Sequence, residues 1–172
     1  AAVARGHSGR APLVPADGQE DEDGQAEPVD VQVERVPEAR RLRVVVDAGN
    51  GMGGFTVPAV LGDGAGLPAL PLDIDPMYFE LDGTFPNHEA NPLIEENRQD
   101  ITAEVIRQSA DVGIAWDGDA DRCFFLDGSG EFIPGDFITA LLAEAFLLKH
   151  PGSTVVYDLR ASHAVKDTVA RY

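Results

Sequence analysis

Residues 111–122 read DVGIAWDGDADR, a short apolar run followed at once by three aspartates at alternate positions. The run Val112–Trp116 is apolar on both faces, as expected of a central strand that helices cover on each side. Asp117, Asp119 and Asp121 come directly after it, at the edge where open α/β sheets place their ligands. The stretch therefore predicts a buried strand and a candidate site at its carboxyl end.

Strands and helices alternate on both sides of this stretch. Further strands are predicted at 42–47, 67–72, 122–126 and 154–157, and helices near residue 55 and over 93–109, 136–148 and 162–171. The 93–109 helix has one predicted apolar face, formed by Leu93, Ile94, Ile101, Val105 and Ile106. The order predicts an α/β fold with a three-layer, mixed but largely parallel sheet flanked by helices.

The first 41 residues differ from the rest of the chain. They contain an acidic polar run at 19–24 and several prolines, so residues 1–41 are predicted to be a disordered acidic tail. A short helix over 29–36 is the alternative for part of this segment.

Composition excludes several classes of partner. The 172 residues include 30 acids and 13 Lys or Arg, a formal net charge of −17. Nucleic acid and anionic membranes both require clustered cations, so neither is an expected partner. A single cysteine excludes a disulfide framework and a cysteine zinc site, and favours a reducing, cytoplasmic location. No apolar run approaches the roughly 20 residues of a membrane span.

The three aspartates of 117–121 are separated by small residues, which allow the backbone to curl until the carboxylates converge. Unneutralised, they would repel one another by a few kcal/mol. Ligands that are all oxygen select Mg²⁺, Ca²⁺ or Mn²⁺ over zinc. A calcium EF-hand loop is excluded, because it needs glycine where Arg122 stands and glutamate where Gly128 stands. The alternative is a solvated acidic turn.

A second candidate is the stretch GNGMGG that begins at Gly49. With Gly51 and Gly54 it satisfies the dinucleotide fingerprint G-x-G-x-x-G directly after a strand. Asp47 at the mouth of the loop weakens that interpretation, because a pyrophosphate would meet its negative charge there. Pro58 weakens it too, because the helix that follows a dinucleotide-binding loop should be longer and uninterrupted. A tight turn packed against a neighbouring loop is the alternative.

Four separated segments carry a family resemblance. They are VVVDAGNGMGG (44–54), DGTFPNHEANPL (82–93), DVGIAWDGDADR (111–122) and GEFIPGD (130–136). In this order they resemble the α-D-phosphohexomutases, in particular bacterial phosphomannomutase/phosphoglucomutase. The resemblance covers about residues 42–172. It implies that 42–128 are the family's second domain, with a Mg²⁺-binding loop. It also implies that 129–172 are the truncated beginning of its third domain, and thus an incomplete second α/β domain in this chain.

The resemblance also implies an activity and site residues. Enzymes of this family interconvert hexose 1-phosphates and 6-phosphates through a phosphoserine and a bisphosphorylated sugar intermediate. By the same resemblance, Asp117, Asp119 and Asp121 bind Mg²⁺, and Arg122 lies beside the phosphate of the phosphoserine. Arg160 is similar to a basic residue near the bound phosphosugar.

His88 lies in a motif loop and is predicted as a substrate contact, with a hydrogen-bonded loop histidine as the alternative. Trp116 and Cys123 flank the acidic motif and are predicted to pack beneath it, Cys123 as a small buried hydrophobe. Ser162 stands in the letters ASH, which the family uses around its serine. It follows the wrong strand, so a helix N-cap is predicted instead.

The family's serine loop lies in a first domain upstream of its second, and residues 1–41 are too few and too acidic to fold such a first domain. The sequence therefore predicts a fragment that is inactive on its own. A noncatalytic remnant or a partner-docking domain is the alternative.

Overall fold

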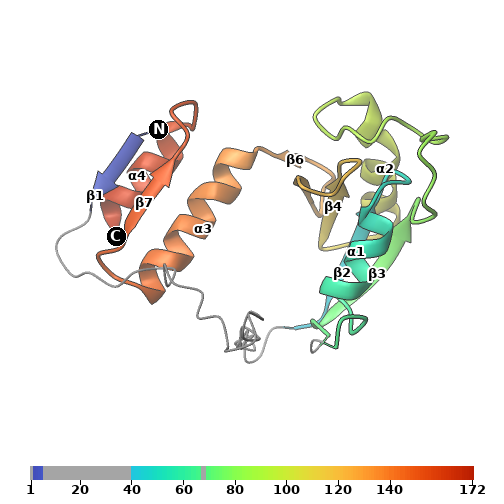
Figure 1. Ribbon diagram of the computed structural model, residues 1–172, viewed down its shortest axis with the longest axis horizontal. Helices are drawn as coiled ribbons and strands as arrows, with labels where there is room; N and C mark the ends of the chain where they lie inside the picture. Colours follow the sequence, from blue (N-terminus) through green and yellow to red (C-terminus); the bar gives the residue numbers. More distant parts are fainter. Residues whose placement is uncertain (1, 6–39, 67–68) are drawn as a thin grey trace, which may run out of the picture. The chain divides into compact units, whose positions relative to one another are not determined.

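The computed structural model describes residues 2–5, 40–66 and 69–172 (Figure 1). The chain divides into two compact units, and each is described by itself. Among the described residues, one unit lies within 39–135, and the other comprises residues 136–172 together with residues 2–5. The division falls at 135/136, and the 128/129 boundary between the family domains stays a prediction.

Five of the described strands form one mixed sheet in the 39–135 unit. They are β2 (Leu42–Asp47), β3 (Leu72–Met77), β4 (Val112–Trp116), β5 (Cys123–Asp127) and β6 (Phe132–Ile133), in the spatial order β3-β2-β4-β5-β6. Strand β2 pairs in parallel with β3 and β4, whereas β5 pairs antiparallel with β4 and β6. The α/β class and the mixed sheet are confirmed, and β4 is central as predicted.

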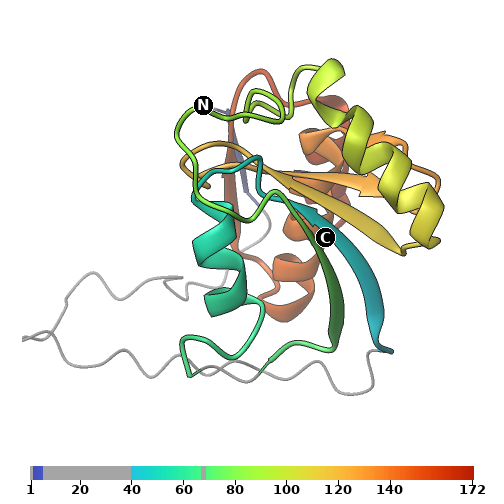
Figure 2. The same ribbon diagram turned by 90° about the vertical axis from the view of Figure 1, so that its right-hand side faces the viewer.

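Alternate residues of the sheet pack against helices on opposite faces. Val45 packs with Ile101 and Val105 of helix α2 (Gln99–Gln108). Its neighbours Val44 and Val46 pack with Val57 of helix α1 (Gly53–Val60). Successive strand residues point to opposite faces, so α1 and α2 lie on the two sides of the sheet (Figure 2). The predicted three layers follow from this alternation.

Fewer apolar side chains of helix α2 are buried than the sequence predicts. Ile101 and Val105 are fully buried, but Ile106 is 55% exposed. Leu93 and Ile94 precede the helix and are also exposed, because a turn and the short 3₁₀ helix η1 (Glu96–Arg98) come first. The helix therefore begins six residues later than the sequence predicts.

Strand β3 begins at Leu72, where the sequence predicts the strand to end. A proline lacks the N–H that a sheet ladder uses, so Pro68 and Pro71 fall before the strand. Pro76 lies inside it, which is tolerated because β3 is an edge strand with β2 as its only neighbour in the described sheet. The predicted 73–92 loop is correspondingly shorter, and it runs over residues 78–95.

The second unit contains helix α3 (Gly135–Lys149, from its second residue), strand β7 (Thr154–Tyr157) and helix α4 (His163–Arg171). Buried Ala143 and Leu147 of α3 and Val165 and Val169 of α4 form its core. Strand β1 (Ala2–Arg5) pairs antiparallel with β7. Residues 2–5 of the predicted disordered tail therefore form a strand instead. Residues 6–39, with the alternative helix at 29–36, lie outside the described residues.

Ser162 stands at the N-cap position of α4, as predicted, with an extended backbone. Its hydroxyl makes no capping hydrogen bond, and its backbone N–H donates to Asp136 Oδ2 over 3.2 Å. Asp136 itself lies in the first turn of α3, which begins one residue earlier. No helix in the described ranges is long and apolar enough to cross a membrane.

Candidate metal and phosphate site

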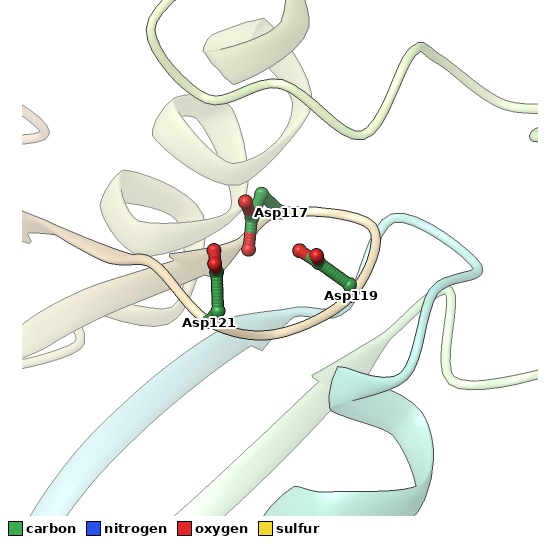
Figure 3. Close-up of side chains that lie close together, drawn as sticks. All are labelled: Asp117, Asp119 and Asp121. Carbon is green, nitrogen blue, oxygen red and sulfur yellow. The ribbon is translucent and has the colours of Figure 1, made fainter.

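The acidic loop, residues 117–122, joins the antiparallel neighbours β4 and β5. Asp117, Asp119 and Asp121 each offer a carboxylate oxygen, and these oxygens all lie within 4.8 Å of one another. Figure 3 shows the three side chains pointing toward a common centre. The structure thus brings the three predicted ligands together. Asp117 is buried, while Asp119 and Asp121 are exposed.

Backbone hydrogen bonds close the acidic loop. The N–H of Asp117 donates to the carbonyl of Arg122 over 3.2 Å, and the N–H of Ala120 donates to the carbonyl of Asp117 over 3.1 Å. Ala120 adopts a left-handed conformation, with φ of 57°. The N–H of Arg122 donates to Asp117 Oδ1 over 3.0 Å. The small residues between the aspartates therefore permit the curl that the sequence predicts.

The second oxygen of Asp117 supplies the test of a metal site. Oδ2 is buried and accepts no hydrogen bond from the described residues. Arg122 Nε lies 2.6 Å away and forms an ion pair with it. A buried carboxylate oxygen is costly unless a cation faces it, and Arg122 supplies a cation on this side of Asp117. Three converging, oxygen-only ligands fit a hard divalent cation such as Mg²⁺.

Arg122 is the cation of the acidic loop. Its Nε contacts Asp117 and lies 3.3 Å from Asp121 Oδ1, and the Asp117 carboxylate raises the pKa of the guanidinium. The side chain is 57% exposed, so a phosphate group from solvent can reach it. The guanidinium fork suits phosphate oxygens.

The glycine loop, residues 48–52, packs directly against the acidic loop. The N–H of Met52 donates to the carbonyl of Gly118 over 3.0 Å. A Cβ atom on Gly51 would lie 2.6 Å from that carbonyl oxygen and 2.9 Å from the Gly118 Cα. Only glycine at position 51 allows this approach.

These contacts bear on the dinucleotide interpretation. The N–H of Gly49 donates to Asp47 Oδ1 and that of Asn50 to the carbonyl of Tyr78, both over 2.8 Å. A Cβ on Gly54 would lie 2.1 Å from the carbonyl oxygen of Phe79. Amides that cradle a pyrophosphate must be free to donate to it. The contacts favour the packed turn over a phosphate-binding loop.

His88 is held inside the chain through both ring nitrogens. Nε2 lies 2.9 Å from Asp47 Oδ2, and Nδ1 lies 2.9 Å from the carbonyl oxygen of Glu89. Both partners are acceptors, so the ring satisfies them as an imidazolium with two N–H groups. The hydrogen bond with Asp47 raises the pKa of His88 to about 9, against an opposing effect of burial. A substrate contact through His88 stays a prediction, and it requires one of these bonds to break.

Asp47 is the functional candidate that sequence reasoning missed. Its side chain is 2% exposed and pairs with His88. In the sequence it stands only as a negative charge beside the glycine loop. The sequence signal that could have found Asp47 is a carboxylate at the end of a buried strand, together with a histidine in a motif loop that could pair with it.

Arg160 lies in the other unit, directly after β7. Its Nε is 3.0 Å from Asp158 Oδ1, and its side chain is 91% exposed. This hydrogen bond is the main reason why the pKa of Asp158 falls to about 2. Arg160 is thus accessible, and its contact with a phosphosugar stays a prediction.

The two residues predicted to pack beneath the acidic loop differ in burial. Trp116 is half-buried against the α1 core, with its Cβ and Cγ close to Gly53. Cys123 is exposed, so its predicted burial is wrong. It opens β5 at the loop end, whereas burial of that strand comes further along, at Leu126.

Comparison with known proteins assigns the family. Residues 24–130 match the family model described as phosphoglucomutase/phosphomannomutase, alpha/beta/alpha domain II. The match begins inside the segment that the sequence predicts to be a tail. It includes the glycine loop, the 78–95 loop and the acidic loop, which are the three segments that meet at the candidate site.

Named relatives agree. The chain is 48% identical over 120 residues to a protein named phosphohexose mutases from Xanthomonas campestris pv. campestris strain B100, covering 69% of this chain and 25% of the relative. It is 44% identical over 128 residues to a phosphomannomutase of Escherichia coli K12, covering 74% and 28%. The chain thus spans about a quarter of the length of these curated relatives.

A solved structure gives the same result. The crystal structure of a phosphoglucomutase/phosphomannomutase family protein from Burkholderia thailandensis matches with a TM-score of 0.63 and 33% identity, over 76% of this chain and 28% of that one. The family model, the named relatives and this fold agree on one assignment. The chain belongs to the phosphoglucomutase/phosphomannomutase family, and it carries that family's α/β/α domain II.

Proposed function

We propose that this chain supplies the Mg²⁺-binding part of a phosphohexomutase, which interconverts hexose 1-phosphate and hexose 6-phosphate through an enzyme phosphoserine. The observation that carries the proposal is the convergence of three carboxylate oxygens within 4.8 Å of one another, one of them from the buried Asp117. Family membership supports the class of reaction, an isomerisation of sugar phosphates.

Each residue of the acidic loop has a separate proposed role. Asp117, Asp119 and Asp121 hold the ion, which would supply positive charge for phosphate oxygens when bound. Arg122 contacts the phosphate through its planar fork. The three carboxylates, one divalent cation and one guanidinium sum to a net charge of zero. A phosphate group can therefore approach a chain of net charge −17.

Phosphoryl transfer depends mainly on positioning and charge neutralisation. The closed backbone of the acidic loop keeps the carboxylates in place, and the exposed Arg122 orients the phosphate. Arg160 is proposed as a second basic contact to the phosphosugar, and its 91% exposure supports that role. His88 is proposed as a weaker substrate contact.

The whole reaction is proposed for an enzyme of the relatives' length, including its bisphosphorylated sugar intermediate. The 172-residue chain is expected to bind the metal but not to turn over. A mutase assay with glucose 1-phosphate and a bisphosphate activator tests this, and measurable turnover by the purified chain would overturn it. A cytoplasmic location, expected from the single cysteine, also stays a prediction.

Calorimetric titration of Mg²⁺ into the chain tests the metal site. Asp119→Ala removes an exposed ligand and should leave the fold intact while abolishing the binding heat. Asp63→Ala is the matched control, because it removes another exposed carboxylate of the same unit outside the acidic loop. Equal heats from the wild type and Asp119→Ala would contradict the metal assignment.

A further inference from the structure

A buried ion pair joins two of the loops that surround the acidic loop. Asp47 ends strand β2 beside the glycine loop, and His88 lies in the 78–95 loop. The side chains are 2% and 12% exposed, and Nε2 of the histidine lies 2.9 Å from Oδ2 of the aspartate. Screening by water is weak at such burial, so the pair is a strong link between the two loops.

Both of these loops press on one residue of the acidic loop, Gly118. From the glycine loop, the N–H of Met52 donates to the Gly118 carbonyl, and Gly51 lies against its Cα. From the 78–95 loop, Phe85 Cζ and Ala90 Cβ lie 3.3 and 3.7 Å from the position that a Gly118 Cβ would occupy. Gly118 is therefore held between the two loops, directly after the buried ligand Asp117.

Further contacts tie the same two loops together close to the ion pair. Asn87 Nδ2 donates to Asn50 Oδ1 over 2.7 Å. A Cβ on Gly49 would lie 3.1 Å from Ala90 Cβ and 3.4 Å from His88 Cε1. The side chain of His88 thus packs on the backbone of the glycine loop as well as pairing with Asp47.

We propose that Asp47 and His88 are a positioning pair for the acidic loop. Their contact holds the glycine loop and the 78–95 loop against Gly118, and so keeps Asp117, Asp119 and Asp121 at the spacing that a divalent cation needs. The inference rests on the proposed function of the acidic loop. Neither residue is a proposed metal ligand, and both act through Gly118.

The protonation of His88 provides a readout that a purely structural contact would not move. The titratable groups around its ring are Asp47 on β2, Tyr78 after β3 and Asp100 on α2. Tyr78 packs edge-on against the imidazole and donates its hydroxyl to Asp100 over 2.7 Å. Loss of the ring proton removes one hydrogen bond and the attraction to Asp47. The contact between the two residues should therefore weaken as the pH rises through about 9.

The test is Mg²⁺ affinity across neutral and alkaline pH for the wild type, His88→Gln and Asp47→Asn. We expect the wild type to lose affinity as the pH rises through about 9. Both variants should bind about tenfold more weakly at neutral pH, without that alkaline step. Asp111→Asn is the matched control, since it breaks an ion pair with Arg40 in the same unit, away from Gly118. Unchanged affinity and an unchanged alkaline step in His88→Gln would overturn the proposal.

A second measurement uses the wild-type chain alone, so it does not depend on whether a variant folds. In metal-free wild-type chain, the Gly118 amide signal should shift with pH at the same midpoint as the His88 ring nitrogens. A Gly118 signal that ignores the titration of His88 would overturn the positioning role. If the wild type bound no Mg²⁺, the proposed function would fail, while this titration would still decide whether the pair positions the acidic loop.

Discussion

The backbone N–H of Met52 donates to the carbonyl of Gly118, which ties the glycine loop to the acidic loop over 3.0 Å. Gly51 lies in the same contact, so two backbones meet without a side chain between them. The spacing of the carboxylates therefore depends on a residue that carries no chemistry of its own.

Gly51→Ala should displace the acidic loop. Its Cβ would lie 2.6 Å from the Gly118 oxygen, a backbone atom that can move only with its loop. We expect a loss of unfolding free energy of about 2 kcal/mol, together with weaker Mg²⁺ binding. Urea unfolding and calorimetry measure the two effects. Gly83→Ala is the control, because a Cβ there meets no atom within 4 Å.

Stability should fall at alkaline pH through His88. Its pKa is raised from 6.5 to about 9, chiefly by the hydrogen bond with Asp47. A raised pKa means that the stabilisation is fully present below pH 6.5 and is lost as the pH rises through about 9. The loss is on the order of 3 kcal/mol. Urea unfolding at a series of pH values should show it in the wild type, and an equal loss in His88→Gln would refute it.

Removing the guanidinium of Arg122 should tighten metal binding. Arg122 is the cation that now faces Asp117, and a divalent ion must share the acidic loop with it. Arg122→Gln keeps the backbone N–H that bonds to Asp117 Oδ1. Less repulsion between cations should lower the dissociation constant of Mg²⁺ severalfold in calorimetry. Weaker binding would instead mean that the guanidinium orders the carboxylates.

Alanine substitutions at the two isoleucines of α2 should cost very different amounts of unfolding free energy. Ile101 is fully buried between α2 and the sheet, so Ile101→Ala should cost about 3 kcal/mol of unfolding free energy. Ile106 is 55% exposed, and Ile106→Ala should change stability by no more than about 0.5 kcal/mol. Denaturant midpoints of the two variants check this, and similar losses would restore the wider apolar face that the sequence predicts.

Local patterns in the sequence were enough for the centre of the site. The apolar run Val112–Trp116 and the alternating aspartates lie within one short segment, so strand β4 and the convergence of the carboxylates were predictable. The position of β3 at 72–77 was not predictable from the sequence. Pro76 argues against a strand there until the strand is known to lie at the edge of the sheet.

Contacts between distant segments were the part that the sequence could not supply. Asp47 and His88 are 41 positions apart, and only the assembled sheet brings them together. The exposure of Cys123 and Ile106 likewise depends on where neighbouring elements end. Propensity describes each segment, but tertiary packing decides which of its faces is covered.

The order of the sheet has a consequence for the kinetics of folding. Strands β4 and β5 are joined by the short acidic loop, so their pairing involves only local contacts. We expect the glycine loop to reach the acidic loop later, because β2 pairs with β3 and β4 through contacts between segments far apart in the sequence. A cation that needs the finished loop binds the native state rather than the folding transition state. Mg²⁺ should therefore slow unfolding and leave the folding rate unchanged.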